Sequence, residues 1–465
     1  MTDLSPAERV ARGKAARAEV PRSSHADFQP SEDRPDPVDL LLEQAESRIP
    51  ELVPVLYGRM LVSPSTFYRG AARIMASDLA TTPNSELHVQ LCGDAHLSNF
   101  GGFASPERRL LFDINDFDET LPGPWEWDVK RFVASLAVAG RDNQYSAAES
   151  RSIVLAAMGE YRSAMRNFAS MRTLDVWYSS MDLDDTIQQV RGELDQKQVT
   201  LLRKGAAKAR THDSAQAFQK LTVRTREGLR IANRPPLIVP IEELLPDEVD
   251  REQVTAELLG LVRTYRRTLE TDRRRLLEQF RPIHLARKVV GVGSVGTQDW
   301  IGLFLGRDDR DPLLLQIKEA QESVLERFVG RSGYTNHGQR VVAGQRLMQA
   351  TSDIFLGWDR VGTGLDGRQK DFYVRQLRDW KFSLEIGAML PRGMAAYGRA
   401  CAWTLARAHA RSGDRIAISA YLGGGDAFDR AIADFAETYA DQNERDYGAF
   451  REAVNAGRVK AQTGL

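Results

Sequence analysis

The residues best suited to chemistry lie in one stretch, from Leu91 to Asp118, which reads LCGDAHLSNFGGFASPERRLLFDINDFD. It holds Asp94 after a glycine, Asn99 five residues later, and a cluster of aspartates towards its end. A phosphoryl-transfer site needs a carboxylate beside the attacking hydroxyl, because that oxygen must lose its proton as its bond to phosphorus forms. Asp94 is our candidate for this catalytic base.

Magnesium, which neutralises the charge on transferred phosphates, needs hard oxygen ligands, commonly one or two carboxylates with an amide. Asn99 and Asp116 are the first candidates, with Asp118 and Asp113 as rivals. Because side chains alternate between the faces of a strand, Asp116 and Asp118 would share one face and Asp113 would take the other. We therefore predict Asn99, Asp116 and Asp118 as metal ligands. A Gly-Asp turn followed by Asn also occurs in loops without catalytic function, but the order and spacing of the motifs together favour catalysis.

A second group of candidates lies in ARKVVGVGSVGTQDWIGLFLGRDDRDPLLLQIKEA, residues 286–320. Gly291, Gly293 and Gly296 stand in G-x-G-x-x-G spacing around Ser294, a pattern shared by dinucleotide-binding folds and kinase glycine loops. A dinucleotide site requires a helix directly after the glycines, whereas TQDWIGLFLG has β character. We therefore predict a strand, a glycine turn whose backbone approaches phosphates, and a second strand.

The next strand, PLLLQIKEA, carries Lys318 after an apolar run, as a kinase strand carries the lysine that reaches the α- and β-phosphates. We choose Glu322 as the carboxylate partner of Lys318, ahead of Glu319 and Glu326. The runs DIFLGW and DFYVRQLRD would complete a small antiparallel sheet and pass into a hinge. There adenine would meet the backbone of Gln376, Leu377 and Arg378. The alternative is that the glycines only relieve bends and Lys318 lies on an edge strand.

Both strands and helices are predicted to position these residues. HVQLCGD and RRLLFDIND have strand patterns and are predicted to form a hairpin around the catalytic stretch. Residues 38–80 and most of 129–280 have apolar residues at helical spacing. Arg59, Arg69 and Lys130 are further candidates for contact with phosphate, the alternative being a structural role.

The length, charge and cysteine content of the chain limit its domain organisation, its partners and its location. At 465 residues the chain exceeds a usual single core, so two or more subdomains are expected. Lys and Arg number 63 and Asp and Glu 64, a net charge of -1, so no overall field would recruit nucleic acid or an anionic membrane. Cys92 and Cys401 are too few for a disulfide framework or a zinc cluster. Without a signal-peptide pattern or a run of about 18 apolar residues, the chain is expected in the cytoplasm.

We predict four parts along the chain. They are a mobile N-terminal arm at 1–36, a helical lobe with the catalytic and metal motifs at 37–285, a small β lobe with the glycine turn and lysine at 286–380, and C-terminal helices that complete the large lobe at 381–465. Because this segment is charged and interrupted by proline, it is predicted to be a mobile arm or a loosely docked helix.

A family resemblance follows from the quoted motifs. GDAHLSN resembles the catalytic loop of aminoglycoside and choline phosphotransferases and of protein kinases, and NDFDE resembles the metal-binding strand end that follows it. The resemblance implies that Asp94 is the base and that Asn99 and Asp116 hold magnesium. WEWDVKR resembles the segment whose aspartate braces the catalytic loop, which implies that role for Asp128. The sequence departs from the pattern at Cys92, where the phosphotransferases have a histidine.

The order of the motifs departs from that superfamily as well. The helix MAAYGRACAWTLARAHARSGD resembles the one that normally runs directly into the catalytic loop, yet here that loop lies far upstream. We infer a circular permutation with the cut just before HVQLCGD, which is tolerable at a surface connection. The segments YGRM, FYRGAARIMASDLA and GDAHLSNFG resemble a bacterial family called domain of unknown function 2252. The expected fold is α+β and protein-kinase-like, with a helical large lobe and a small antiparallel β lobe.

The expected function is ATP- and magnesium-dependent phosphoryl transfer to an unidentified hydroxyl, by analogy that of a small molecule. Two alternatives remain: transfer of AMP to a protein acceptor, and a non-catalytic ATP-binding pseudokinase, which Cys92 would favour. A nicotinamide oxidoreductase is disfavoured by the missing helix after the glycines. Expected partners are a nucleotide and a small-molecule or protein acceptor, without membrane or nucleic acid.

Overall fold

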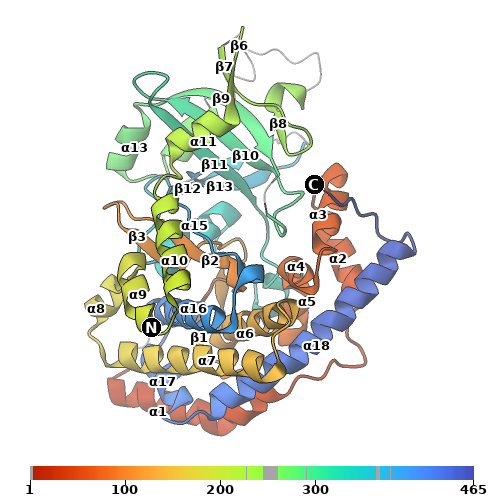
Figure 1. Ribbon diagram of the computed structural model, residues 1–465, viewed down its shortest axis with the longest axis vertical. Helices are drawn as coiled ribbons and strands as arrows, with labels where there is room; N and C mark the ends of the chain where they lie inside the picture. The colour runs from red at the N-terminus through yellow and green to blue at the C-terminus, as the bar shows by residue number, and fades with distance from the viewer. Residues whose placement is uncertain are drawn as a thin grey trace.

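The computed structural model describes residues 4–226, 228–244, 260–289, 291–362, 367–377 and 379–464. A six-stranded sheet lies at one end of the molecule and a larger assembly of helices at the other, with α15 (His337–Met348) between them (Figure 1). The predicted α+β class is therefore confirmed.

The large sheet is antiparallel throughout, with the strand order β12-β13-β11-β10-β9-β8. Its strands are β8 (Ile238–Pro240), β9 (Arg281–Lys288), β10 (Asp299–Leu305), β11 (Pro312–Ala320), β12 (Gly357–Val361) and β13 (Lys370–Gln376). Every residue of β10 is buried, because helices cover both faces of the sheet. One face packs against α11 (Ser214–Leu221) and the other against α13 (Thr271–Leu277). The sheet thus begins before the predicted boundary at 286, since β8 is too short to give a sequence signal.

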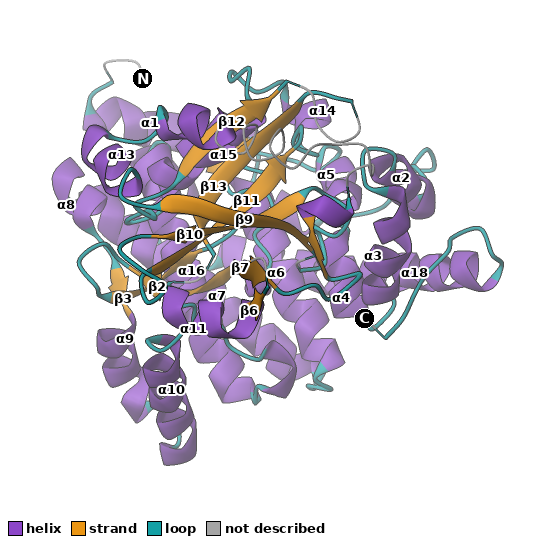
Figure 2. Cartoon of the chain, turned by 90° about the horizontal axis from the view of Figure 1, so that it is seen from above, coloured by secondary structure: helices purple, strands orange, loops and turns teal. Residues whose placement is uncertain are grey.

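The helical part is built around α6 (Trp125–Asp142), which is buried over most of its length, as expected for a helix that is covered on every side. Around it lie α7 (Ala147–Ser170), α16 (Pro391–Ser412) and α18 (Ala427–Asn455) (Figures 1 and 2), and α17 (Arg415–Leu422) packs against α7. Within the described ranges, no helix is both long and apolar enough to cross a membrane.

Shorter helices complete the molecule. They are α1 (Pro6–Glu19), α2 (Pro37–Ala45), α3 (Val53–Met60), α4 (Pro64–Gly70), α5 (Ala72–Leu79), α8 (Thr173–Tyr178), α9 (Leu183–Gln189), α10 (Gln196–Ala209) and α14 (Glu326–Val329). The hairpin of β6 (Thr222–Thr225) and β7 (Gly228–Ile231) extends beyond the large sheet.

The hairpin predicted around the catalytic stretch is wrong in its pairing. β1 (His88–Leu91) pairs with β4 (Leu121–Pro124), not with β3 (Leu110–Ile114). β3 instead pairs with β2 (Phe100–Ala104) and with β5 (Met181–Asp182). The reason is that the residues between the two predicted strands form a strand of their own, which takes the hairpin partner.

The N-terminal segment, expected to be a mobile arm, packs on the helical part. α1 begins with a capping box between Ser5 and Glu8 and lies against α17, so closely that a Cβ on Gly13 would stand 2.1 Å from the Ala417 carbonyl oxygen. Arg34 binds Asp78 and Asp446, each at 2.6 Å. The charges that suggested a solvated arm are thus partly paired with residues far along the chain.

The C-terminal end of α16 lies against β1. The backbone N–H of Gln90 donates to Ser412 Oγ at 3.2 Å, although the two residues are 322 positions apart. A Cβ on Gly413 would stand 2.5 Å from Val89 Cγ1, so the two segments are in close contact. The strand that leads into the catalytic stretch therefore starts where α16 ends.

Candidate active site

A cavity of about 640 Å³ lies between the sheet and the helices. Its lining includes, from the predicted site, Asp94, Asn99, Asp116, Asp118, Gly291, Gly293, Ser294 and Glu322. Two groups of residues that are far apart in the sequence thus meet at one cavity. Gly296, Lys318, Gln376 and Leu377 do not line it, and Arg378 lies outside the described residues.

Asp128 holds the loop that carries Asp94, because its carboxylate accepts the backbone N–H groups of Cys92 at 2.8 Å and Gly93 at 2.9 Å. These bonds perform the bracing role that the resemblance implied for Asp128. Gly93 has φ +84°, and a Cβ there would stand 2.4 Å from the Glu119 carbonyl oxygen, so only glycine fits. His409 Nε2 lies 3.2 Å from Asp128 Oδ2, the oxygen that also accepts the Cys92 N–H, so His409 is a buried partner of the Asp128 carboxylate.

Asp94 is held as a carboxylate by a buried arginine. Arg131 Nε and Nη2 each lie 2.8 Å from Asp94 Oδ1, and the guanidinium stacks 3.9 Å above the Tyr68 ring. Burial acts to raise the pKa of Asp94, but nearby positive charge, chiefly that of Arg131, holds it below its ordinary value. Oδ2 lies 3.6 Å from His96 Nε2, and burial lowers the pKa of His96 to about 4. Asp94 Oδ2 is therefore the oxygen left to accept a proton.

Asn99 and Asp116 offer oxygen atoms that the protein uses little. Asn99 Nδ2 donates to the Asp94 carbonyl oxygen at 2.7 Å, which leaves the Asn99 amide oxygen for another ligand. Asp116 accepts the Asp118 backbone N–H at 3.3 Å. Burial and the neighbouring Asp118 raise the pKa of Asp116, while the charge of Lys318 acts to lower it. A divalent cation would stabilise this charge. In the described part of the chain, no three His, Cys, Asp or Glu side chains form a metal-binding group, so such a cation would depend on a set that includes an amide.

Lys318 is paired with Asp118, not with Glu322 as predicted. Lys318 Nζ lies 2.5 Å from Asp118 Oδ2, and Tyr373 Oη donates to Asp118 Oδ1 at 2.6 Å. Burial opposes the charge of Lys318, but Asp116 and Asp118 raise its pKa well above the ordinary value. The Glu322 prediction assumed a helix after β11, whereas α14 begins only at Glu326, and the Glu322 side chain is exposed.

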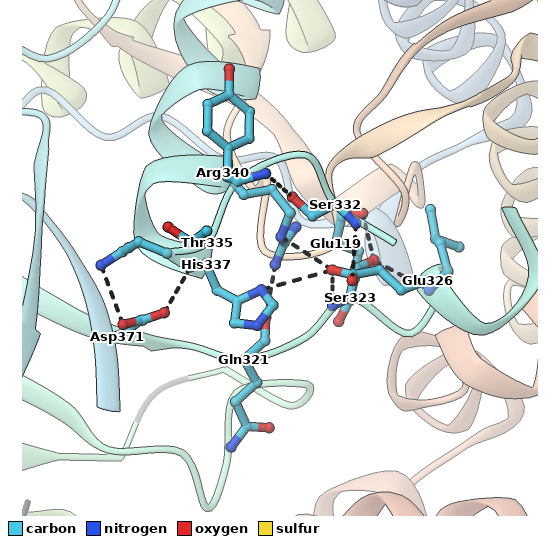
Figure 3. Close-up of polar contacts among 12 residues, drawn as sticks. Glu119, Gln321, Ser323, Glu326, Ser332, Thr335, His337, Arg340 and Asp371 are labelled. Carbon is cyan, nitrogen blue, oxygen red and sulfur yellow. Dashed lines mark hydrogen bonds and ion pairs between the residues drawn. The ribbon is translucent and has the colours of Figure 1, made fainter. Parts of the chain in front are cut away.

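The other two glutamates near Lys318 have partners of their own. Glu319 binds Lys370 at 2.8 Å. Glu326 lies 3.8 Å from Arg340 and 3.7 Å from His337 (Figure 3). Lys318 therefore has its ion pair with the catalytic stretch and not with its own part of the chain.

α15 is fastened to the acidic segment by Arg340, which is buried at 1% side-chain exposure. Its guanidinium donates to the carbonyl oxygens of Asp118 at 2.8 Å, Thr120 at 2.7 Å and Gln321 at 2.8 Å. Figure 3 shows Arg340 beside Glu119, Glu326 and His337, and Asp371 at the start of the helix, where it accepts the His337 N–H at 2.8 Å. The helix thus fixes the position of the segment that carries Asp116 and Asp118.

The glycine turn is held from outside by the N-terminal helices. Val292 and Val295 are buried in a cluster that includes residues of α2, α3 and α18. Arg48 and Arg59 donate to the carbonyl oxygens of Val295 and Gly291. The turn backbone at Gly293 stays open, since the nearest atom to an added Cβ is the Arg69 carbonyl oxygen at 3.7 Å. Of the three predicted phosphate contacts outside the main motifs, Arg59 thus touches the turn.

The other two residues considered for contact with phosphate, Arg69 and Lys130, lie in different surroundings. Arg69 lines the cavity, and its buried Nε has no hydrogen-bond partner among the described residues. Lys130 is buried away from it and donates to Thr82 Oγ1 at 2.8 Å, so Lys130 has the structural role and not the contact with phosphate. Sequence periodicity could not separate them, because both are basic residues in segments with a helical pattern.

The predicted hinge contacts are taken up within the protein. The Gln376 N–H donates to Asp353 Oδ2 at 2.9 Å, and the Leu377 N–H donates to the Leu314 carbonyl oxygen at 2.9 Å. These amides are therefore not available to adenine in this arrangement. The sequence suggested the strand and its end, but it did not reveal that Asp353 would cap that end.

Comparison with known proteins identifies a family. A family described as uncharacterized protein conserved in bacteria (DUF2252) matches residues 48–453. No curated protein and no solved structure matches the chain.

Proposed function

The chain belongs to the bacterial DUF2252 family, and we propose that it is an ATP- and magnesium-dependent phosphotransferase with a circularly permuted, protein-kinase-like fold. The observation that carries the proposal is the ion pair of 2.5 Å between Lys318 and Asp118. It joins β11, the second strand after the glycine turn, to the acidic end of the catalytic stretch, beside the cavity that both groups of residues line.

The topology of the sheet supports the kinase-like part of the proposal. The glycine turn connects β9 to β10, Lys318 lies on β11, the third strand when counted from β9, and α15 follows before β12 and β13. Protein kinases likewise have a glycine loop, then a lysine on the third strand, then a helix whose glutamate pairs with that lysine. In this chain α15 contributes Arg340 instead, and the carboxylate comes from Asp118.

The contact between α16 and β1 supports the permutation. In the unpermuted order a helix like α16 would continue directly into the strand of the catalytic loop. The Gln90 N–H to Ser412 Oγ bond of 3.2 Å spans that junction. A chain cut there and rejoined elsewhere keeps its folded contacts.

Asn99 and Asp116 fit a magnesium ion, because they are an amide and a carboxylate with oxygen atoms that the described residues leave largely unused. When bound, magnesium would neutralise charge on the phosphates. Asp94 Oδ2 would accept the proton of the acceptor hydroxyl, since Arg131 occupies Oδ1 and keeps the carboxyl charged. The open backbone at Gly293 would allow the phosphates to approach closely.

Transfer of AMP is a second candidate, favoured by the use of the Gln376 and Leu377 amides within the protein. A nucleotide whose base is not held at those amides can lie with a different phosphate next to Asp94. The transferred group would then be the nucleotidyl group.

The test combines binding with isotope transfer. Thermal unfolding is measured with and without magnesium-ATP for the native chain, for Lys318→Ala and Asp116→Ala, and for Asp175→Asn on exposed α8 as a control. We expect a magnesium-dependent rise in the midpoint that is kept by the control and lost in the two site variants. Label transferred from the γ-phosphate and abolished in Asp94→Asn supports phosphotransfer, and label from the α-phosphate supports AMP transfer. An unchanged midpoint at saturating magnesium-ATP would contradict both.

A further inference from the structure

A second cavity, of about 330 Å³, adjoins the first. Of the residues that line it, Arg69 and His96 are shared with the larger cavity. The rest come from α4, from Leu97 and Ser98 just after Asp94, from α6, and from residues 384–387. The second cavity is therefore reached from the catalytic base across a boundary formed by Arg69 and His96.

We propose that this second cavity is the acceptor site and that it takes a small, neutral, polyhydroxylated molecule such as a monosaccharide or polyol. The inference rests on the proposed phosphotransferase function. In phosphoryl transfer the attacking and leaving oxygens lie roughly in line on opposite sides of phosphorus. Acceptor and nucleotide must then approach from opposite sides, which two cavities with a shared boundary permit.

The chemistry of the lining defines the class of acceptor. It contains five serine and threonine hydroxyls. Those of Ser63, Thr66 and Ser135 already donate to Asp142 Oδ2 and to the carbonyl oxygens of Ser63 and Phe132, whereas no described residue bonds the hydroxyls of Ser65 and Ser98, which are left for a ligand. Apolar side chains of Val138, Leu384 and Ile386 complete the lining. A sugar presents the same combination, hydroxyls at its edge and C–H groups on its faces.

Charge and size exclude other acceptors. Apart from His96, the charged lining residues are Arg69 and Asp142, whose opposite charges favour neither a polyanion nor a polycation. Asp142 Oδ2 already accepts Ser63 Oγ at 2.7 Å and the Ser65 N–H at 3.2 Å. At about 330 Å³ the cavity is at the lower end of ligand sites, so it suits one or two sugar rings and not a protein segment.

Arg69 has the position expected of a group that stabilises the transferred phosphoryl. Its Nε is buried without a hydrogen-bond partner in the described part of the chain. Burial lowers the pKa of Arg69 below its ordinary value, although the charges of Asp94 and Asp116 act to raise it. In the reaction the acceptor O–H bond breaks, its proton passes to Asp94 Oδ2, and its oxygen bonds to the γ-phosphorus. The bond from that phosphorus to the β–γ bridging oxygen breaks, and ADP leaves.

Gly387 lines the second cavity, and a Cβ added there would meet no atom within 4 Å, so a larger side chain can be placed at the edge of this cavity without a clash at its Cβ. The matched control is Gly159→Leu on α7, where an added Cβ also meets nothing within 4 Å and which lines neither cavity. The probes are γ-labelled ATP with a panel of neutral monosaccharides and polyols, a polyamine, a sugar phosphate and a protein acceptor such as casein.

We expect labelled product from neutral sugars or polyols, unchanged in Gly159→Leu and reduced about tenfold or more in Gly387→Leu. The magnesium-ATP midpoint shift should persist in Gly387→Leu, which shows that this variant is folded. Three outcomes would overturn the acceptor assignment and leave the nucleotide site intact. They are magnesium-ATP binding without any labelled sugar or polyol, labelled product only from the protein acceptor, and equal amounts of product from the two variants. If magnesium-ATP does not raise the unfolding midpoint of the native chain, the proposed phosphotransferase function is overturned instead.

Discussion

Lys318 Nζ lies 2.5 Å from Asp118 Oδ2, although 200 residues separate them in the chain. The lysine side chain is only 3% exposed, so its charge has lost most of its hydration. Tyr373 binds the second oxygen of the same carboxylate at 2.6 Å. This pair is a direct polar connection between the sheet and the catalytic stretch, and it fixes the acidic segment relative to the glycine turn.

Removing one member of this pair should destabilise the fold more than removing both. Lys318→Met or Asp118→Asn alone leaves an unpaired buried group and is expected to cost about 3 kcal/mol. The double variant should recover part of that loss, with a coupling of about 1 to 3 kcal/mol in a double-mutant cycle from urea unfolding. The exposed pair of Arg172 and Asp175, 2.8 Å apart, is the control and should show no measurable coupling. Additive effects at Lys318 and Asp118 would contradict the structural role.

Two glycines of the turn should respond differently to alanine. Gly296 has φ +92°, and an added Cβ would stand 3.0 Å from Arg48 Cβ, so Gly296→Ala should lower stability by about 1 kcal/mol or more. Gly293 has room for a Cβ, so Gly293→Ala should keep the midpoint of the native chain. If phosphates approach the backbone there, Gly293→Ala should nevertheless reduce the midpoint shift with magnesium-ATP. A full shift in Gly293→Ala would remove this residue from the nucleotide site.

The sequence predicted best what lies within one local stretch. Asp94 and Asn99 are five residues apart, and their contact at 2.7 Å belongs to a single loop, so spacing alone indicates it. The partner of Lys318 could not be found in this way, because it depends on how two distant segments pack. The choice of Glu322 over the adjacent Glu319 rests on a helix that would carry both Glu322 and Glu326, and it fails because α14 begins only at Glu326.

The same reasoning explains which parts of the fold were missed. The α+β class follows from the alternation of strand and helix patterns. The packing of α1 against α17 does not, because nothing in either helix pattern identifies its partner. Arg34 illustrates the difficulty, since a lone arginine in a charged segment gives no sign that it will be buried between Asp78 and Asp446.

Asp128 should be essential to the order of the loop that carries Asp94. Asp128→Asn replaces one acceptor oxygen by an amino group, so one of the N–H groups of Cys92 and Gly93 loses its partner. We expect a loss of about 1 to 3 kcal/mol and faster hydrogen exchange at these two amides. Asp195→Asn is the control, because asparagine also caps a helix N-terminus well. Unchanged exchange at Cys92 and Gly93 would show that the loop does not depend on Asp128.

The buried His25 should make stability depend on pH in the acid range. It is fully buried and binds Tyr421 Oη at 2.5 Å, and burial, with the charge of Lys130, lowers its pKa to about 3. The folded His25 thus stays neutral between pH 6.5 and about 3, while the unfolded chain takes up a proton there. Its contribution to stability is complete above the unfolded pKa and falls by about 1.4 kcal/mol per pH unit as the pH drops below it.

His25→Phe, which keeps the ring contacts with Tyr421 and Phe428, should therefore flatten the plot of unfolding free energy between pH 6 and 4. The exposed His88→Asn should leave that slope as it is, and a His25→Phe slope equal to the native one would refute the assignment.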